Sequence, residues 1–335
     1  MPTAPTTAFS PQFTTPARAE TAAHAARRRA AQVAEAFLTP AAHAAVPSLD
    51  FLPSGRRLAI PTPEGRIAAA ESGQGPAVLL VHGWEGKASD MAAFAAPLLD
   101  AGLRVVVMNL PAHGESDGAQ TSIPASARGL LAVQSAIGPL HALIAHSVGS
   151  AVAVEAMALG LKVGRAVLIA APAHYADYAT AFAAQSGLDA EESALMIAAL
   201  AQRGVDVHAV AMPRRALALH QPALFLHSSD DRIVPITDAI DSSNAWPGAR
   251  LLRFDGLGHR RILQAATVVD AACYSLYVGV IEECCFDRFQ ISHKVSLLDM
   301  HAKYGIVMSL QEVAEYLRTK AQPTPVFRKA PEPVR

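Results

Sequence analysis

The stretch ALIAHSVGS, residues 142–150, carries the strongest structural signal in the chain. Its first four residues are apolar, which is typical of a strand buried on both faces of a parallel sheet. Ser147 follows, with Ala145 two positions before it and Gly149 two positions after it. Residues 147–159 continue with small and apolar side chains and favour a helix. A serine in a sharp turn between a strand and a helix is typical of a catalytic nucleophile, because such a turn admits only small neighbours and exposes the hydroxyl.

Two features weaken this pattern when it stands alone. A serine at a helix start can serve simply as an N-cap, which accepts a hydrogen bond from the first turn. The strict form of the motif also has glycine on both sides, whereas this chain has Ala145 on one side. Alanine adds one methyl group and is the mildest departure in steric terms. The rest of the chain must therefore decide whether Ser147 is a nucleophile.

Short apolar runs recur before and after this stretch and alternate with segments of helical pattern. The predicted strands are residues 78–81, 105–108, 142–145, 166–170, 223–226 and 250–254, with helices between them, for example 91–99 and 125–137. A Pro/Gly turn joins residues 57–60 to 66–71 and predicts a hairpin ahead of them. Alternating strands and helices imply right-handed crossovers and a mostly parallel sheet covered by helices.

Ligands bind at the carboxyl ends of the strands in such sheets, so the segments after each strand are the candidates for chemistry. The run 78–81 leads into His82, Gly83 and Trp84. If Ser147 attacks a carbonyl group, the resulting oxyanion needs two backbone N–H donors. We expect these donors from Val148 and Trp84, since Gly83 permits the backbone angle that turns the second amide inward.

The last two predicted strands supply candidates for a base and an acid. The run 250–254 is followed by the glycine-rich segment DGLGH, which ends in His259. The run 223–226 is followed by Asp230 and Asp231, either of which can orient a histidine or merely cap the next turn. The chain order is then serine, aspartate, histidine, in keeping with a nucleophile activated by a base that an acid holds in place.

Four segments together resemble the α/β-hydrolase superfamily, and more narrowly a bacterial group of α/β-fold serine hydrolases. They are LLVHGWEG (79–86), NLPAHGES (109–116), DRIVP (231–235) and GLGHRRIL (256–263). In the second segment, Asn109 and Ala112 depart from the usual D-x-P-G-H-G-x-S pattern. The resemblance covers about residues 20–275, and its acid segment matches the family at Asp231 rather than Asp230.

The resemblance implies an α/β-hydrolase fold and an esterase-like reaction. Ser147 is then the nucleophile, His259 the general base and Asp231 the acid, and a small-molecule carboxylic ester of small to medium acyl size is the expected substrate. No cofactor and no metal is implied. A thioester, an amide or a C–C bond remains an alternative substrate, because a fold does not determine its substrate. A non-catalytic ligand-binding protein of the same fold is a further alternative.

The composition and net charge of the chain argue against some classes of binding partner. The chain has 335 residues, 51% of them hydrophobic and 17% charged, with a formal net charge of −1. This charge gives no case for nucleic acid or an anionic membrane as partner. No apolar run reaches the length of a membrane span, and three cysteines clustered late in the chain make no disulfide framework. We expect a cytoplasmic protein, and the sequence leaves its oligomeric state open.

The expected organisation has three parts. Residues 1–17 are predicted to be disordered, residues 18–283 to form the hydrolase domain, and residues 284–335 to be an atypical, partly disordered extension. The interval between the strands 166–170 and 223–226 is too long for one crossover. It predicts a helical lid insertion over about residues 173–221.

Overall fold

The computed structural model describes residues 16–41, 48–276, 279–281, 306–309, 311–312 and 314–315. Two compact units divide the chain between them. The larger unit comprises Thr39–Tyr175 and His208–Arg335, and the smaller comprises Met1–Leu38 and Ala176–Val207.

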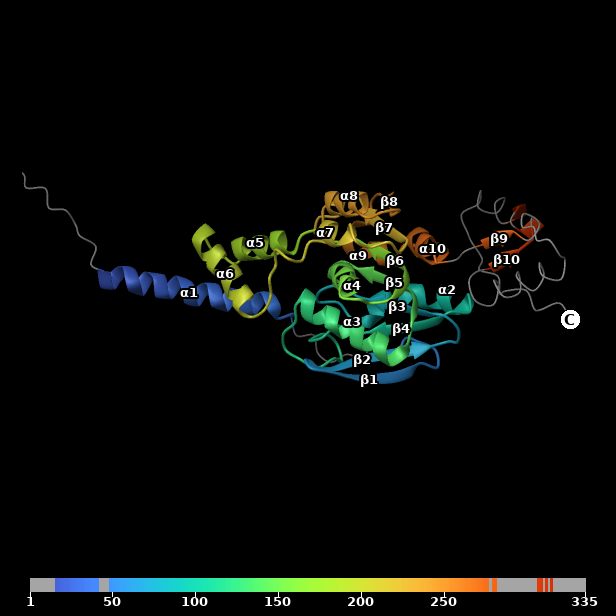
Figure 1. The fold of residues 1–335 in the computed structure, drawn as a ribbon, viewed down its shortest axis with the longest axis horizontal. Coiled ribbons are helices and arrows are strands. Elements are labelled where there is room, and N and C mark those ends of the chain that lie inside the picture. Colours follow the sequence, from blue (N-terminus) through green and yellow to red (C-terminus); the bar gives the residue numbers. More distant parts are fainter. Residues whose placement is uncertain are drawn as a thin grey trace, which may run out of the picture. The chain divides into compact units, whose positions relative to one another are not determined.

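An eight-stranded sheet forms the centre of the larger unit, in the order β1-β2-β4-β3-β5-β6-β7-β8 (Figure 1). The strands are β1 Arg56–Thr62, β2 Gly65–Ser72, β3 Ala77–Val81, β4 Arg104–Met108, β5 Leu140–His146, β6 Val163–Ile169, β7 Ala223–Ser228 and β8 Arg250–Phe254. β2 pairs antiparallel with β1 and with β4, and all other pairs are parallel. The predicted hairpin and the mostly parallel sheet are therefore confirmed.

Helices connect the strands of this sheet. They are η1 Ala88–Phe94, α2 Ala95–Asp100, α3 Ile123–Ile137, α4 Val148–Ala158, α7 Met212–Ala216, α8 Ile236–Ala245, α9 Gly258–Arg261, η2 Ile262–Gln264 and α10 Ala266–Tyr274. The sequence predicted one helix over residues 91–99, but the structure has a 3₁₀ segment followed by a short α-helix there. Pro97 explains the break, because it has no N–H to donate to the preceding turn and is tolerated only in the first turn of a helix.

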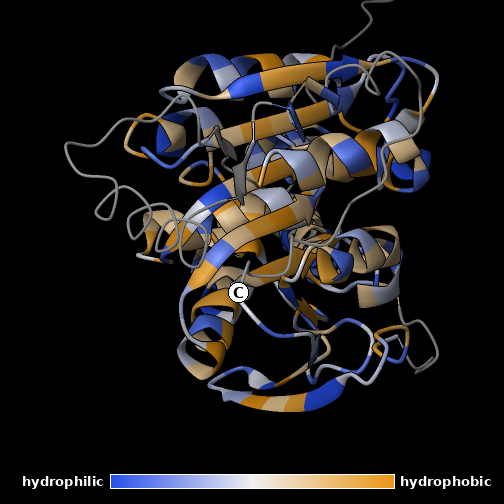
Figure 2. Ribbon diagram, turned by 90° about the vertical axis from the view of Figure 1, so that its right-hand side faces the viewer, coloured by the Kyte–Doolittle hydropathy of each residue, from blue (hydrophilic) through white to orange (hydrophobic). Residues whose placement is uncertain are grey.

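Alternate residues of the strands pack into two separate cores. Leu79 of β3 and Val106 of β4 belong to the core that contains residues of α3, α4, α7 and α8. Leu80 and Val107 belong to the core that contains residues of η1, α2 and α10. Successive side chains of a strand point to opposite faces, so unbroken apolar runs are required where both faces are covered. In Figure 2, several strands are drawn largely in the colours of hydrophobic residues.

The smaller unit contains three helices, α1 Pro16–Leu38, α5 Tyr175–Gln185 and α6 Ala190–Gln202. The first residue of α5, Tyr175, still belongs to the larger unit. Arg29 of α1 forms an ion pair with Glu192 of α6 at 3.1 Å and also donates to the Gly187 carbonyl at 3.2 Å. The Phe37 and Phe182 rings lie 5.3 Å apart. Residues 176–207 of the expected lid are thus tied to α1, whereas residues 208–221 belong to the larger unit.

Both ends of the insertion are held within the larger unit. Met212 N–H donates to the Ala173 carbonyl at 2.7 Å, and Tyr175 N–H donates to the Val210 carbonyl at 3.2 Å. Arg215 of α7 makes two hydrogen bonds of 2.9 Å to the buried carboxylate of Glu155 in α4. Such a paired guanidinium–carboxylate contact is directional, so it fixes the end of the insertion to the helix that follows Ser147.

The two ends of the chain are described only in part. Residues 1–15, and most of the expected extension 284–335, lie outside the described residues, as do Cys284 and Cys285. Helix α1 begins at Pro16, inside the segment predicted to be disordered. Toward the C-terminus, β9 Gly279–Ile281 pairs in parallel with β10 Ile306–Met308. Among the described helices, none is both long and apolar enough to span a membrane.

Candidate active site

Ser147 lies at the turn between β5 and α4 with backbone angles φ 51° and ψ −127°. This conformation is costly for a residue with a side chain, of order 1–3 kcal/mol, and is maintained only by close packing around the turn. Gly149 shows how close that packing is, because a Cβ there would lie 2.3 Å from the His82 carbonyl oxygen. A Cβ on Gly83 would likewise lie 3.0 Å from the Ser147 Cβ. The small residues around Ser147 are therefore required by contacts with the loop after β3.

Ser147, His259 and Asp231 form a hydrogen-bonded series, although they come from three separate loops. His259 Nε2 lies 2.9 Å from Ser147 Oγ, and His259 Nδ1 lies 2.7 Å from Asp231 Oδ2. The carboxylate accepts the Nδ1 proton, which leaves Nε2 as the acceptor for the serine hydroxyl. This is the tautomer that a general base needs.

Asp231 is held as a carboxylate by several donors. Its Oδ1 accepts hydrogen bonds from the amides of Ile233 at 2.8 Å and Val234 at 3.0 Å. Burial opposes ionisation of this side chain, but the hydrogen bonds from His259 and from the two amides outweigh it and lower the pKa of Asp231 below its ordinary value. The carboxylate is thus ready to stabilise a positive charge on His259.

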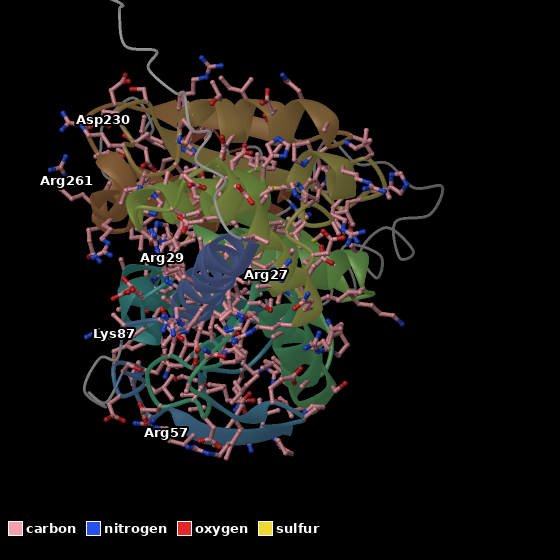
Figure 3. The ribbon with its side chains drawn as sticks, turned by 90° about the vertical axis from the view of Figure 1, so that its left-hand side faces the viewer. Arg27, Arg29, Arg57, Lys87, Asp230 and Arg261 are labelled. Carbon is pink, nitrogen blue, oxygen red and sulfur yellow. The ribbon has the colours of Figure 1, made fainter. Side chains whose placement is uncertain are left out.

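Asp230 has a different position. Its side chain is exposed (Figure 3). Its Oδ1 accepts hydrogen bonds from the Gly258 amide, at 3.0 Å, and from the Ser228 hydroxyl. Ser228 Oγ in turn accepts the amides of Leu257 and Gly258, both at 3.1 Å. Asp230 therefore supports the loop that carries His259 without touching the imidazole. Of the two aspartates that the sequence left in competition, the structure brings Asp231 to the histidine.

The loop after β3 holds the second expected oxyanion donor, Trp84. Gly83 places this loop against Ser147, as the distances above show, and Gly86 N–H donates to the Gly83 carbonyl at 3.0 Å to close a turn. Val148 is the first residue of α4, so its amide has no partner within the helix. Both predicted donors thus lie on segments adjoining Ser147.

Two further histidines, which the sequence analysis gave no role, anchor this loop to the segment after β4. His82 Nδ1–H donates to the Gly83 carbonyl at 2.7 Å, while its Nε2 accepts the Leu110 amide at 3.0 Å. His113 Nε2 accepts the Glu85 amide at 3.1 Å. A buried imidazole needs hydrogen-bond partners. A histidine inside a predicted site segment therefore indicates a hydrogen bond that holds that segment, although the sequence does not identify the partner.

Two more histidines adjoin the series formed by Ser147, His259 and Asp231. His146 donates from Nε2 to the main-chain carbonyl of His259 at 2.9 Å. His227, wholly buried in β7, donates to the Val234 carbonyl at 2.9 Å and lies 3.7 Å from Asp231 Oδ2. In the part of the chain that the structure describes, no group of three or more side chains of the metal-binding types could hold an ion.

The buried histidines make the fold sensitive to acid. Burial, followed by the effect of neighbouring histidines, lowers the pKa of both His82 and His146 from 6.5 to about 3. Between these values the unfolded chain binds protons that the folded chain does not, so stability is present above pH 6.5 and is lost as the pH falls toward 3. We expect the free energy of unfolding, measured with denaturant, to fall by roughly 1 kcal/mol per pH unit for each histidine.

A variant tests this assignment. His146→Gln removes one of the two groups, and we expect its free energy of unfolding to depend less steeply on pH than that of the wild type. His220→Gln is the control, because His220 is exposed in the folded chain. Equal slopes for His146→Gln and the wild type would contradict the assignment.

Comparison with known proteins identifies the family and supports the fold. The model of the "Alpha/beta hydrolase family" matches residues 78–271, more than half of the chain. No curated protein sequence matches the chain. A thermophilic esterase from Thermogutta terrifontis has a similar structure, with 22% identity and a TM-score of 0.52, over 66% of this chain and 98% of that one.

Two further esterase structures are similar. One, from Rhodococcus sp. ECU1013, has 21% identity and a TM-score of 0.50 over 67% of this chain and 98% of its own. The other, from Exiguobacterium antarcticum, has 17% identity and a TM-score of 0.52 over 63% and 96%. At these identities the likeness establishes the fold, while the family match rests on the sequence itself. The chain belongs to the alpha/beta hydrolase family.

Proposed function

We propose that the protein is a serine hydrolase that cleaves carboxylic esters of small to medium acyl groups through an acyl-enzyme. The hydrogen-bonded series from Ser147 through His259 to Asp231, at 2.9 and 2.7 Å, is the observation that carries the proposal. Three residues from separate loops meet in the order and with the tautomer that nucleophilic catalysis needs. The family match and the esterase neighbours support the same reaction class.

In the proposed mechanism, Ser147 Oγ attacks the ester carbonyl while His259 Nε2 takes the serine proton. The tetrahedral oxyanion is stabilised by the amides of Val148 and Trp84. His259 then protonates the leaving alcohol, and the acyl group remains on Ser147. A water molecule, deprotonated by His259, hydrolyses this acyl-enzyme and regenerates the free serine. Asp231 stabilises the imidazolium in both steps.

Two measurements test the proposed function: covalent labelling of the nucleophile and hydrolysis of a series of esters. A fluorophosphonate probe is expected to label Ser147, because such probes react with an activated serine and leave an inert hydroxyl unmodified. A panel of p-nitrophenyl esters of increasing acyl length then measures kcat/KM, with the highest values expected for the shorter chains. Failure of the probe to label the protein would refute the proposed function. If the probe labels Ser147 but no ester is hydrolysed, thioesters or amides become the proposed substrates.

The pH dependence of kcat/KM tests the role of His259. Activity is expected to rise with pH and then level, because only the neutral imidazole accepts the serine proton. Neighbouring groups are not expected to add a second rise in this range, since the pKa of His146 is lowered to about 3 and that of Asp231 lies below its ordinary value. A fall in kcat/KM with rising pH over this range would contradict this role.

Chelation provides a separate test of the same mechanism. The nucleophile, the base and the oxyanion donors are all protein groups in this proposal, so incubation with EDTA is expected to leave kcat unchanged. Inactivation by EDTA that added metal reverses would show that the reaction needs an ion and would overturn the metal-free mechanism.

A further inference from the structure

We propose that His146 is a positioning residue that holds His259 at hydrogen-bonding distance from Ser147. This inference rests on the proposed function, since it concerns the base of the same site. His146 precedes Ser147 directly, at the end of β5. Its Nε2–H donates to the main-chain carbonyl of His259 at 2.9 Å, across 113 residues of sequence. One side chain thus joins the backbone of the nucleophile turn to the backbone of the loop that carries the base.

The bond from His146 adds a fixed point at the histidine to those that Ser228 and Asp230 provide just before it. His259 lies in α9, a helix of four residues, and the two glycines before it, Gly256 and Gly258, both have positive φ angles of 74° and 60°. Glycine loses more conformational freedom on folding than other residues, so this loop is intrinsically adaptable. Ser228 and Asp230 hold the amides of Leu257 and Gly258 ahead of the histidine, and the bonds to Ser147 and Asp231 orient the imidazole. The bond from His146 holds the carbonyl of His259 itself.

The surroundings of His146 keep it in the role of donor. The side chain is buried, and a Cβ on Gly83 would lie 3.1 Å from its Nδ1. The charged and titratable groups that act on it are His259, Asp231 and Arg260. Burial, followed by the electrostatic effect of the neighbouring His259 side chain, outweighs the hydrogen bond to the His259 carbonyl and the attraction of Asp231, and it lowers the pKa of His146 to about 3. The ring therefore stays neutral during catalysis, with its single N–H on Nε2 directed to the His259 carbonyl.

Ring packing adds to the hydrogen bond. The centroids of the His146 and His259 rings lie 4.8 Å apart, with an angle of 46° between the planes. This contact restricts the base on the side of the nucleophile turn. A substitution that keeps an aromatic ring but removes the N–H separates the two contributions, and His146→Phe is such a substitution.

The experiment compares three substitutions at His146 with one matched control. His146→Phe keeps a ring and loses the donor, His146→Gln keeps an N–H at about the distance of Nε2, and His146→Asn has an N–H that is one methylene too short. His141→Phe is the control, because His141 is the second residue of the same strand and its Nε2 donates to the Leu276 carbonyl at 2.9 Å. The readouts are the rate of fluorophosphonate labelling of Ser147, and kcat and KM for a p-nitrophenyl ester.

Loss of the donor is expected to lower both the labelling rate and kcat by about 10- to 100-fold, because small displacements of a catalytic group have effects of this size. KM is expected to change less than about threefold, since His146 does not contact substrate in this proposal. His146→Gln is expected to recover most of the loss, His146→Asn little of it, and His141→Phe is expected to behave as the wild type. If His146 only stabilised the fold, the activities of the variants would not follow the position of the N–H group in this way.

Two results would overturn the proposal. One is labelling of His146→Phe at the wild-type rate, and the other is equal activity of His146→Gln and His146→Asn. If His146→Phe does not fold, the comparison of the glutamine and asparagine variants decides alone. Failure of the wild type to be labelled is a separate result, which refutes the proposed function and the positioning role together.

Discussion

Replacement of Ser147 by alanine is expected to lower kcat by about a millionfold, to the level that binding and oxyanion stabilisation alone provide. The substitution removes the Oγ that lies 2.9 Å from His259 Nε2 and therefore removes the nucleophile itself. Alanine fits the same space, so the fold is expected to remain, with a change in unfolding free energy of about 1 kcal/mol or less. Turnover of a p-nitrophenyl ester and thermal melting measure the two effects separately.

Ser150→Ala is the matched control for this variant. Ser150 lies three residues after Ser147 in the first turn of α4, is buried, and its hydroxyl donates to the Ala145 carbonyl at 2.9 Å. The control removes a neighbouring serine hydroxyl, and its kcat is expected to stay within severalfold of the wild type. A Ser147→Ala enzyme with wild-type kcat would show that another residue is the nucleophile.

The second large effect is expected for Asp231→Asn, with a fall in kcat of about 10⁴-fold. The asparagine oxygen can still accept the amides of Ile233 and Val234, so the local turn is preserved. Its NH₂ group then faces His259 Nδ1 and donates to it. The histidine proton is forced onto Nε2, and the imidazole can no longer accept the proton of Ser147. The loss is therefore expected in kcat, with intact folding.

Asp230→Asn provides the comparison, since it makes the same chemical change one residue earlier. Asp230 is exposed and contacts the Gly258 amide rather than the imidazole. An amide oxygen can replace that contact, so the effect on kcat is expected to be no more than severalfold. The opposite ranking of the two variants in kcat/KM would assign the catalytic acid to Asp230.

Much of this fold follows from local sequence. The apolar runs of β3 to β7 are continuous because both faces of the strands are covered, and such a pattern can be recognised without tertiary information. The nucleophile turn is equally local, since Ala145, Ser147 and Gly149 lie within five residues and small side chains are a direct consequence of its geometry. The boundary between η1 and α2 was not predicted, because helical periodicity continues across it, and Pro97 lies in the first turn of α2.

Only the tertiary structure decides which groups meet. Asp230 and Asp231 have the same side chain, and the sequence separates them only by resemblance, whereas the turn after β7 directs Asp231 to His259 and Asp230 to the Gly258 amide. His146 bonds to a carbonyl 113 residues away, and residues 176–207 join α1 rather than the sheet. Contacts between distant segments depend on how the elements pack, and local propensity and periodicity do not encode that packing.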